Sequence, residues 1–102
     1  MTFGLRDGDL HYIVQTLGLF PEIKGAYIFG SRAKGTYKPG SDIDIAITGK
    51  DISFSTIARL HALLEDEGPL PYLIDVVHYE NIKNQDLKAH IDRVGKLIYR
   101  AE

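Results

Sequence analysis

Two aspartates and a glycine–serine pair are the residues of this chain whose types and spacing could do chemistry. Gly30-Ser31 is followed by ten residues and then by Asp42-Ile43-Asp44. Side chains in a β-strand alternate between its two faces, so the two aspartates share a face if this segment is a strand. Two carboxylates held close together repel each other, and a hard divalent cation such as Mg²⁺ relieves that repulsion. The pair therefore predicts a magnesium site.

A third aspartate, Asp75, lies inside the apolar segment 72–78. A buried carboxylate without a partner would cost on the order of several kcal/mol. We therefore expect this side chain to need a partner. One candidate is the cation bound by Asp42 and Asp44, and the alternative is an ion pair with an arginine or lysine.

The Gly30-Ser31 pair predicts a site for an anion. Glycine lets the backbone approach a ligand closely, and Ser31 offers a hydroxyl that suits the N-cap of a short helix over 32–34. Free N–H groups at the start of a helix bind phosphate. Three basic side chains follow in the loop and add positive charge: Arg32, Lys34 and Lys38. A solvated loop is the alternative interpretation, above all for Lys38.

The elements that must position these residues are predicted from hydrophobic periodicity. Helices are expected over 8–18, 53–66 and from about 84 to 94, and strands over 24–30, 43–48 and 72–78. The second helix is expected to bury Phe54, Ile57, Leu60 and Leu64. Residues 96–100 fit either a short strand or a continuation of the last helix. The loop between the first two strands is too short for a helical crossover, so we expect an antiparallel pair.

The predicted fold class is α/β (α+β), with a small mixed β-sheet flanked by helices. Residues 1–102 suffice for one domain, and the 44% hydrophobic content is ordinary for a globular protein. There is no cysteine, which excludes disulfides and Cys-ligated zinc. The net charge of −2 gives no argument for nucleic-acid binding. No segment reads as a membrane span or signal peptide, so we expect a cytoplasmic protein.

The spacing of Gly30-Ser31, Asp42 and Asp44, with Asp75 later in the chain, resembles the nucleotidyltransferase superfamily related to DNA polymerase beta. The local sequences Gly-Ser-Arg-Ala-Lys-Gly and Ser-Asp-Ile-Asp are especially similar to its minimal, one-domain members of the MNT type. The resemblance runs from the first helix to the final Gly-Lys-Leu-Ile-Tyr. It implies the nucleotidyltransferase fold over the single domain.

The resemblance also implies roles for the acidic residues. Asp42 and Asp44 match the metal-binding pair of the family. Asp75 matches the third catalytic carboxylate, which shares the metal site and helps to activate the acceptor hydroxyl. The implied cofactor is Mg²⁺, with two ions bridging the carboxylates and the triphosphate of ATP.

Gly30 and Ser31 match the turn that binds the nucleotide phosphates in the family. Arg32 matches a basic position that often follows this turn, and it is a candidate nucleotide-binding residue on that ground.

Minimal members of this family are often paired with a small helical HEPN-domain protein in toxin–antitoxin systems. The resemblance then implies an antitoxin that transfers AMP from ATP to a tyrosine of the HEPN toxin. Two alternatives remain open. One is a small-molecule nucleotidyltransferase, with a homo-oligomer sharing the site between chains. The other is a noncatalytic antitoxin that acts by contact alone.

Overall fold

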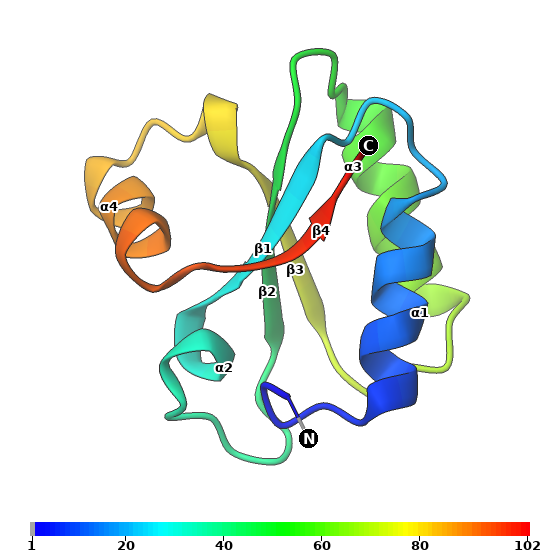
Figure 1. Ribbon diagram of the computed structural model, residues 1–102, viewed down its shortest axis with the longest axis vertical. Helices are drawn as coiled ribbons and strands as arrows, with labels where there is room; N and C mark the ends of the chain where they lie inside the picture. Colours follow the sequence, from blue (N-terminus) through cyan, green and yellow to red (C-terminus); the bar gives the residue numbers. More distant parts are fainter. Residues whose placement is uncertain (1) are drawn as a thin grey trace.

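A four-stranded mixed β-sheet organises the computed structural model, which describes residues 2–102 (Figure 1). The strands lie in the order β3-β2-β1-β4 and have these bounds: β1 Gly25–Phe29, β2 Ile43–Thr48, β3 Ile74–His78 and β4 Lys96–Arg100. The helices are α1 Asp7–Leu17, α2 Gly30–Lys34, α3 Phe54–His61 and α4 Gln85–Val94. A π-helical turn, Ala62–Asp66, extends α3, and a 3₁₀ turn, Tyr79–Asn81, follows β3.

The strand pairing confirms the predicted fold class. β1 and β2 are antiparallel, as the short loop between them required, and β2 and β3 are parallel because α3 provides the crossover. Residues 96–100, for which the sequence left two possibilities, form the edge strand β4 beside β1. Among residues 2–102, no helix combines the length and apolar character needed to cross a bilayer.

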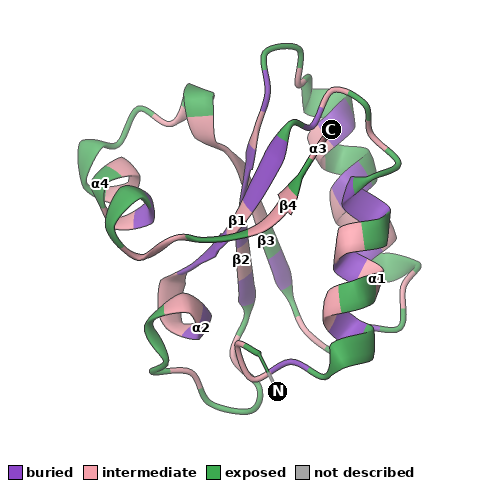
Figure 2. Ribbon diagram, viewed as in Figure 1, coloured by how far each residue is buried: buried purple, intermediate pink, exposed green. Residues whose placement is uncertain are grey.

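One face of the sheet carries the main core. The isoleucines of β2 alternate with polar or small residues, so Ile43, Ile45 and Ile47 all point to the face covered by α1 and α3 and are fully buried. They pack with buried side chains of α1, α3 and the π-helical turn after α3, including Ile13, Leu17, Leu60 and Leu64. Figure 2 shows the buried residues concentrated along β1, β2 and one side of α1.

The other face of the sheet is covered by α4, which lies on the opposite side from α1 and α3 (Figure 1). A small second core joins Ile91 of α4 to Phe29 of β1 and Ala46 of β2. Beyond this apolar group on the same face of the sheet, Asp44 of β2 is partly exposed and Asp75 of β3 is exposed, so a ligand can reach both.

The second helix begins differently from the prediction. Phe54 is 84% exposed, whereas the sequence analysis expected it in the core. Ser53 caps α3 by accepting a hydrogen bond from the Thr56 N–H. The apolar residue before the cap, Ile52, packs against the main core together with Ile57. These are the N′ and N4 positions of a hydrophobic staple, so these two residues provide the apolar contact with the core at the start of α3.

Candidate active site

Three residues form a row across the sheet at the end of β2 nearest α2. Phe29 of β1 is paired with Asp44 of β2, and Asp44 is paired in turn with Asp75 of β3. Neighbouring strands are about 4.8 Å apart, so the two carboxylates are direct neighbours. Asp42 immediately precedes β2, and its negative charge also acts on Asp44. The structure thus brings the three predicted carboxylates into one electrostatic group.

Asp44 lies at the centre of this group, and the pKa of its carboxyl group is raised. Burial raises the pKa of its carboxyl group, and the charges of Asp75 and then Asp42 raise it further, to about 6 from an ordinary value of 3.8. A cation placed between the carboxylates would offset the repulsion from Asp75 and Asp42 and favour the ionised form of Asp44.

The exposure of Asp75 differs from what was predicted from the sequence. The aspartate was expected to be buried within an apolar strand and to need a partner for that reason. Its side chain is exposed, because β3 is an edge strand and α4 does not cover this end of it. The exposed carboxylate is open to an incoming molecule, which a buried one would not be.

The acidic group suits a hard divalent cation in its chemistry. Carboxylate oxygens are the ligands that Mg²⁺ prefers. Burial, and then the charges of Asp75 and Asp42, raise the pKa of Asp44, and a bound cation would favour its ionised form. Within residues 2–102, no three acidic or histidine side chains are already arranged as a complete set of metal ligands. Metal coordination by Asp42, Asp44 and Asp75 therefore stays a prediction.

The turn after β1 requires glycine for two reasons. Gly30 has φ of +71°, a backbone conformation that other residues rarely adopt. A Cβ atom at this position would also overlap the Oδ2 atom of Asp44. The turn and the central carboxylate are therefore packed against each other, which places the predicted phosphate site beside the predicted metal site.

Ser31 is not the cap that the sequence analysis expected. α2 begins at Gly30, with Phe29 in the N-cap position, and no side chain caps the helix. Ser31 lies within the first turn of α2, partly exposed, so its hydroxyl is not used to cap the helix.

Arg32 points into the protein and binds its own loop. The side chain is 2% exposed. The Nε and Nη2 atoms donate hydrogen bonds to the Ser41 carbonyl at 3.1 and 2.7 Å, and Nη1 donates to the Phe3 carbonyl at 2.9 Å. The guanidinium also lies against the rings of Tyr37 and Tyr72, 5.4 and 4.7 Å from their centroids. Planar donors and aromatic stacking are interactions that lysine cannot reproduce.

These contacts favour a positioning role for Arg32. Its two hydrogen bonds to Ser41 fix the residue immediately before Asp42. The Ser41 hydroxyl closes the loop further by accepting a hydrogen bond from the Lys38 N–H. Direct contact of Arg32 with nucleotide phosphates stays a prediction that this geometry does not favour. Lys34 and Lys38 are exposed.

His90 is a residue beside the turn that the sequence analysis missed. The Gly30 N–H donates a hydrogen bond to His90 Nε2 at 3.2 Å. No local pattern could have indicated this contact, because it joins residues sixty positions apart.

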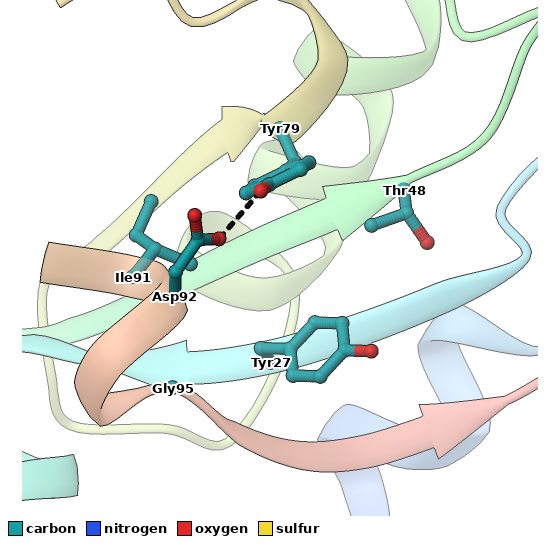
Figure 3. A pocket seen from close by; sticks show the side chains of 6 residues that line it. All are labelled: Tyr27, Thr48, Tyr79, Ile91, Asp92 and Gly95. Carbon is teal, nitrogen blue, oxygen red and sulfur yellow. Dashed lines mark hydrogen bonds between the residues drawn. The ribbon is translucent and has the colours of Figure 1, made fainter. Parts of the chain in front are cut away.

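A separate pocket of about 290 Å³ lies on the same face of the sheet, beside α4. Figure 3 shows Tyr27 and Thr48 on the sheet and the Tyr79 hydroxyl donating to the Asp92 carboxylate across the pocket. Thr48 is four residues along β2 from Asp44, or about 13 Å in an extended strand. The residues that line the pocket do not include Asp42, Asp44 or Asp75.

Replacing Asp44 by asparagine should stabilise the protein near neutral pH in the absence of divalent cations. The pKa of Asp44 is higher in the folded protein than in the unfolded chain, so the folded state binds this proton more tightly. Its contribution to stability is present below about pH 4 and is lost as the pH rises toward 6. After allowance for partial exposure, the removed penalty is on the order of 1–2 kcal/mol.

Thermal unfolding of the two proteins across this pH range checks this expectation, with the exposed Asp51→Asn as a control. Mg²⁺ should raise the unfolding midpoint of the wild type and of the control but not of the Asp44 variant. A variant that is less stable than the wild type near neutral pH without metal would contradict the electrostatic account.

Replacing Arg32 by lysine should loosen the loop before Asp42 although the charge is kept. Lysine cannot donate two hydrogen bonds to one carbonyl while stacking on two rings, and we expect a loss of about 2–3 kcal/mol. Urea unfolding measures the loss, and amide hydrogen exchange over residues 36–41 should become faster. Lys34→Ala, at an exposed position of the same helix, should change neither quantity. Unaltered exchange in the Arg32 variant would exclude the positioning role.

Comparison with known protein families supports the interpretation of this geometry. The family model described as polymerase beta, nucleotidyltransferase, matches residues 11–102. No curated protein sequence matches the chain.

Solved structures share the fold. A chain in a toxin–antitoxin structure with AMP-PNP has 23% identity and a TM-score of 0.73, covering 96% of this chain and 76% of that one. A chain in the structure of tri-AMPylated Shewanella oneidensis HEPN toxin with MNT antitoxin has 21% identity and a TM-score of 0.72, covering 95% and 74%. At these identities the structural similarity establishes the fold alone. Because the family model extends over nearly the whole chain, the protein belongs to the polymerase beta nucleotidyltransferase family.

Proposed function

We propose that this protein transfers AMP from ATP to a hydroxyl group of a protein partner, with Mg²⁺ as cofactor. The observation that carries the proposal is the pairing of Asp44 with Asp75 directly beside the Gly30 turn, in a chain of the nucleotidyltransferase family. This arrangement supports the proposal, because carboxylates that could bind a metal lie next to backbone that a triphosphate could approach.

We assign different roles in the reaction to different residues. Asp42 and Asp44 would bind the metal, and Gly30 and Ser31 would hold the triphosphate of ATP. Two bound Mg²⁺ ions would lower the pKa of the attacking hydroxyl and stabilise the leaving pyrophosphate. The remaining contribution of the protein is to position the reactants and stabilise charge, which dominates in phosphoryl transfer.

Asp75 is the proposed general base. It is the exposed member of the paired carboxylates, and it stands on the edge strand, where an acceptor can approach. The acceptor oxygen would form a bond to the α-phosphorus while the bond from that phosphorus to the bridging oxygen breaks. Pyrophosphate leaves, and Asp75 takes the proton of the hydroxyl.

An exposed leucine next to the acidic group favours an acceptor with an apolar surface. The Ile43 N–H donates to the Leu73 carbonyl, which continues the pairing of β2 with β3 and places Leu73 alongside Asp42. By strand alternation Leu73 shares a face with Asp75, and it is 62% exposed. A tyrosine ring can pack on this leucine while its hydroxyl points toward Asp75. A sugar, whose ring is polar, would gain no apolar contact with Leu73.

The similar structures point to the kind of partner. One contains AMP-PNP, an analogue of ATP, and another contains an AMP-modified HEPN toxin with an MNT antitoxin. We extend this to the present chain and propose a HEPN-type toxin as its partner, with a tyrosine as the acceptor and an antitoxin role. Cytoplasmic location and the absence of nucleic-acid contacts remain predictions.

Replacing Asp42 or Asp44 by asparagine should lower AMP transfer by on the order of 10³-fold, because metal binding contributes several kcal/mol to such reactions. The measurement incubates the protein with ATP, Mg²⁺ and the purified partner and follows the partner by intact mass. The exposed Asp51→Asn is the matched control and should transfer at the wild-type rate.

Two outcomes would contradict the proposed function. If either variant transferred AMP at nearly the wild-type rate, the replaced aspartate could not be an essential metal ligand. Neutralisation of the partner by an Asp42 variant that adds no AMP would instead support an antitoxin acting by contact alone.

Leu73→Ser should weaken acceptor recognition without weakening ATP binding. Burying a leucine side chain is worth about 1.5–3 kcal/mol, so the KM for the protein acceptor should rise about tenfold or more. Leu19→Ser is the control, because Leu19 is equally exposed, at 68%, and follows α1 on the other side of the sheet. An unchanged acceptor KM in the Leu73 variant would favour a small, polar acceptor.

A further inference from the structure

The hydrogen bond between the nucleotide-binding turn and α4 joins the candidate active site to a helix without any predicted site residue. The donor is the Gly30 N–H and the acceptor is His90 Nε2, 3.2 Å away. We propose that His90 is a positioning residue, which fixes the Gly30 peptide in the orientation needed for nucleotide binding. The proposal rests on the function proposed above.

The contact defines the form of the imidazole ring. Because Nε2 accepts a hydrogen bond from a backbone N–H, it carries no proton, and the neutral ring bears its proton on Nδ1. The ring also meets the ring of Phe29 edge-on, with centroids 6.1 Å apart and planes at 79°. His90 therefore touches both residues of the peptide that begins the turn.

This peptide needs an external support. Gly30 has a positive φ, and glycine is the residue with the greatest conformational freedom, so the backbone on its own does not select this state. The Asp44 carboxylate occupies the space where a Cβ would lie, so no side chain at position 30 can restrain the turn. A hydrogen bond from outside the turn is a way to restrain it that leaves Asp44 in place.

α4 is well suited to provide this support. Its N-terminus is capped by Asn84, whose side chain accepts the N–H groups of Asp86 and Leu87. Ile91, next to His90, is buried against Phe29 and Ala46. The helix is thus fixed to the sheet at the residue adjacent to the histidine.

The contact also limits which groups can bind the phosphates. The Gly30 N–H is already committed to His90, so Gly30 would contribute to triphosphate binding by letting the backbone approach closely and not by donating this N–H. The donors of the turn then begin at Ser31, with its N–H and hydroxyl. His90 sets the orientation of the peptide but does not touch the substrate.

Two substitutions separate the hydrogen bond from the packing. His90→Gln keeps an acceptor oxygen at about the position of Nε2. His90→Phe keeps the ring and its edge contact with Phe29 but has no acceptor. If His90 positions the turn, the phenylalanine variant should lose about tenfold in kcat/KM for ATP, the glutamine variant should retain most of it, and both should unfold at similar temperatures. His11→Phe, at an exposed position on α1, is the control.

Amide hydrogen exchange of Gly30, measured without nucleotide or metal, gives a readout that does not depend on catalysis. Exchange should be faster in His90→Phe than in the wild type and close to the wild-type rate in His90→Gln. Equal Gly30 exchange and equal kcat/KM in the wild type and both variants would overturn the proposal, and so would equal losses in both variants. If the wild type transfers no AMP, the exchange experiment still decides the role of His90.

Discussion

Repulsion among carboxylates is the constraint on which the rest of this structure depends. Asp44 is half-buried, its strand partner Asp75 carries the same charge, and Asp42 adds a third. A fold selected only for stability would not keep three such groups together, because each raises the free energy of ionising Asp44. The isoleucines of β2 supply compensating apolar burial on the opposite face. This unfavourable electrostatic grouping is the physical ground for the proposal that the acidic group binds a cation.

Three contacts hold the surroundings of this group in place. Gly30 leaves room for the Asp44 carboxylate, and His90 accepts the N–H of the same turn. Arg32 holds the carbonyl of Ser41, directly before Asp42. Each contact involves a residue of the acidic group or a residue next to it. The loop, the turn and α4 therefore all restrain the surroundings of the three carboxylates. This agrees with the general need to fix reacting groups before substrate binds.

Local pattern was enough to predict the elements that carry the site. The alternation of isoleucines in β2 predicted Ile43–Thr48 as a strand, and the short loop predicted its antiparallel pairing with β1. The spacing of Asp42 and Asp44 predicted that their charges would act together. These features depend on neighbours in the chain, which is why the sequence alone indicated them.

Features set by distant parts of the chain were missed. The exposure of Asp75 follows from the edge position of β3, which is a property of the whole sheet. The burial of Arg32 was not foreseen, because the Phe3 carbonyl and the Tyr72 ring that surround it come from remote segments. His90 had no local signal, since only the packing of α4 brings it to Gly30. Tertiary contacts, more than residue type, determine these roles.

The most direct test of the central claim is a crystal structure with Mn²⁺ and a non-hydrolysable ATP analogue, using anomalous scattering to locate the metal. The account predicts manganese bound by carboxylate oxygens of both Asp42 and Asp44, at about 2.1–2.2 Å, and the triphosphate against Gly30-Ser31. Manganese bound elsewhere, or a triphosphate distant from the turn, would contradict it.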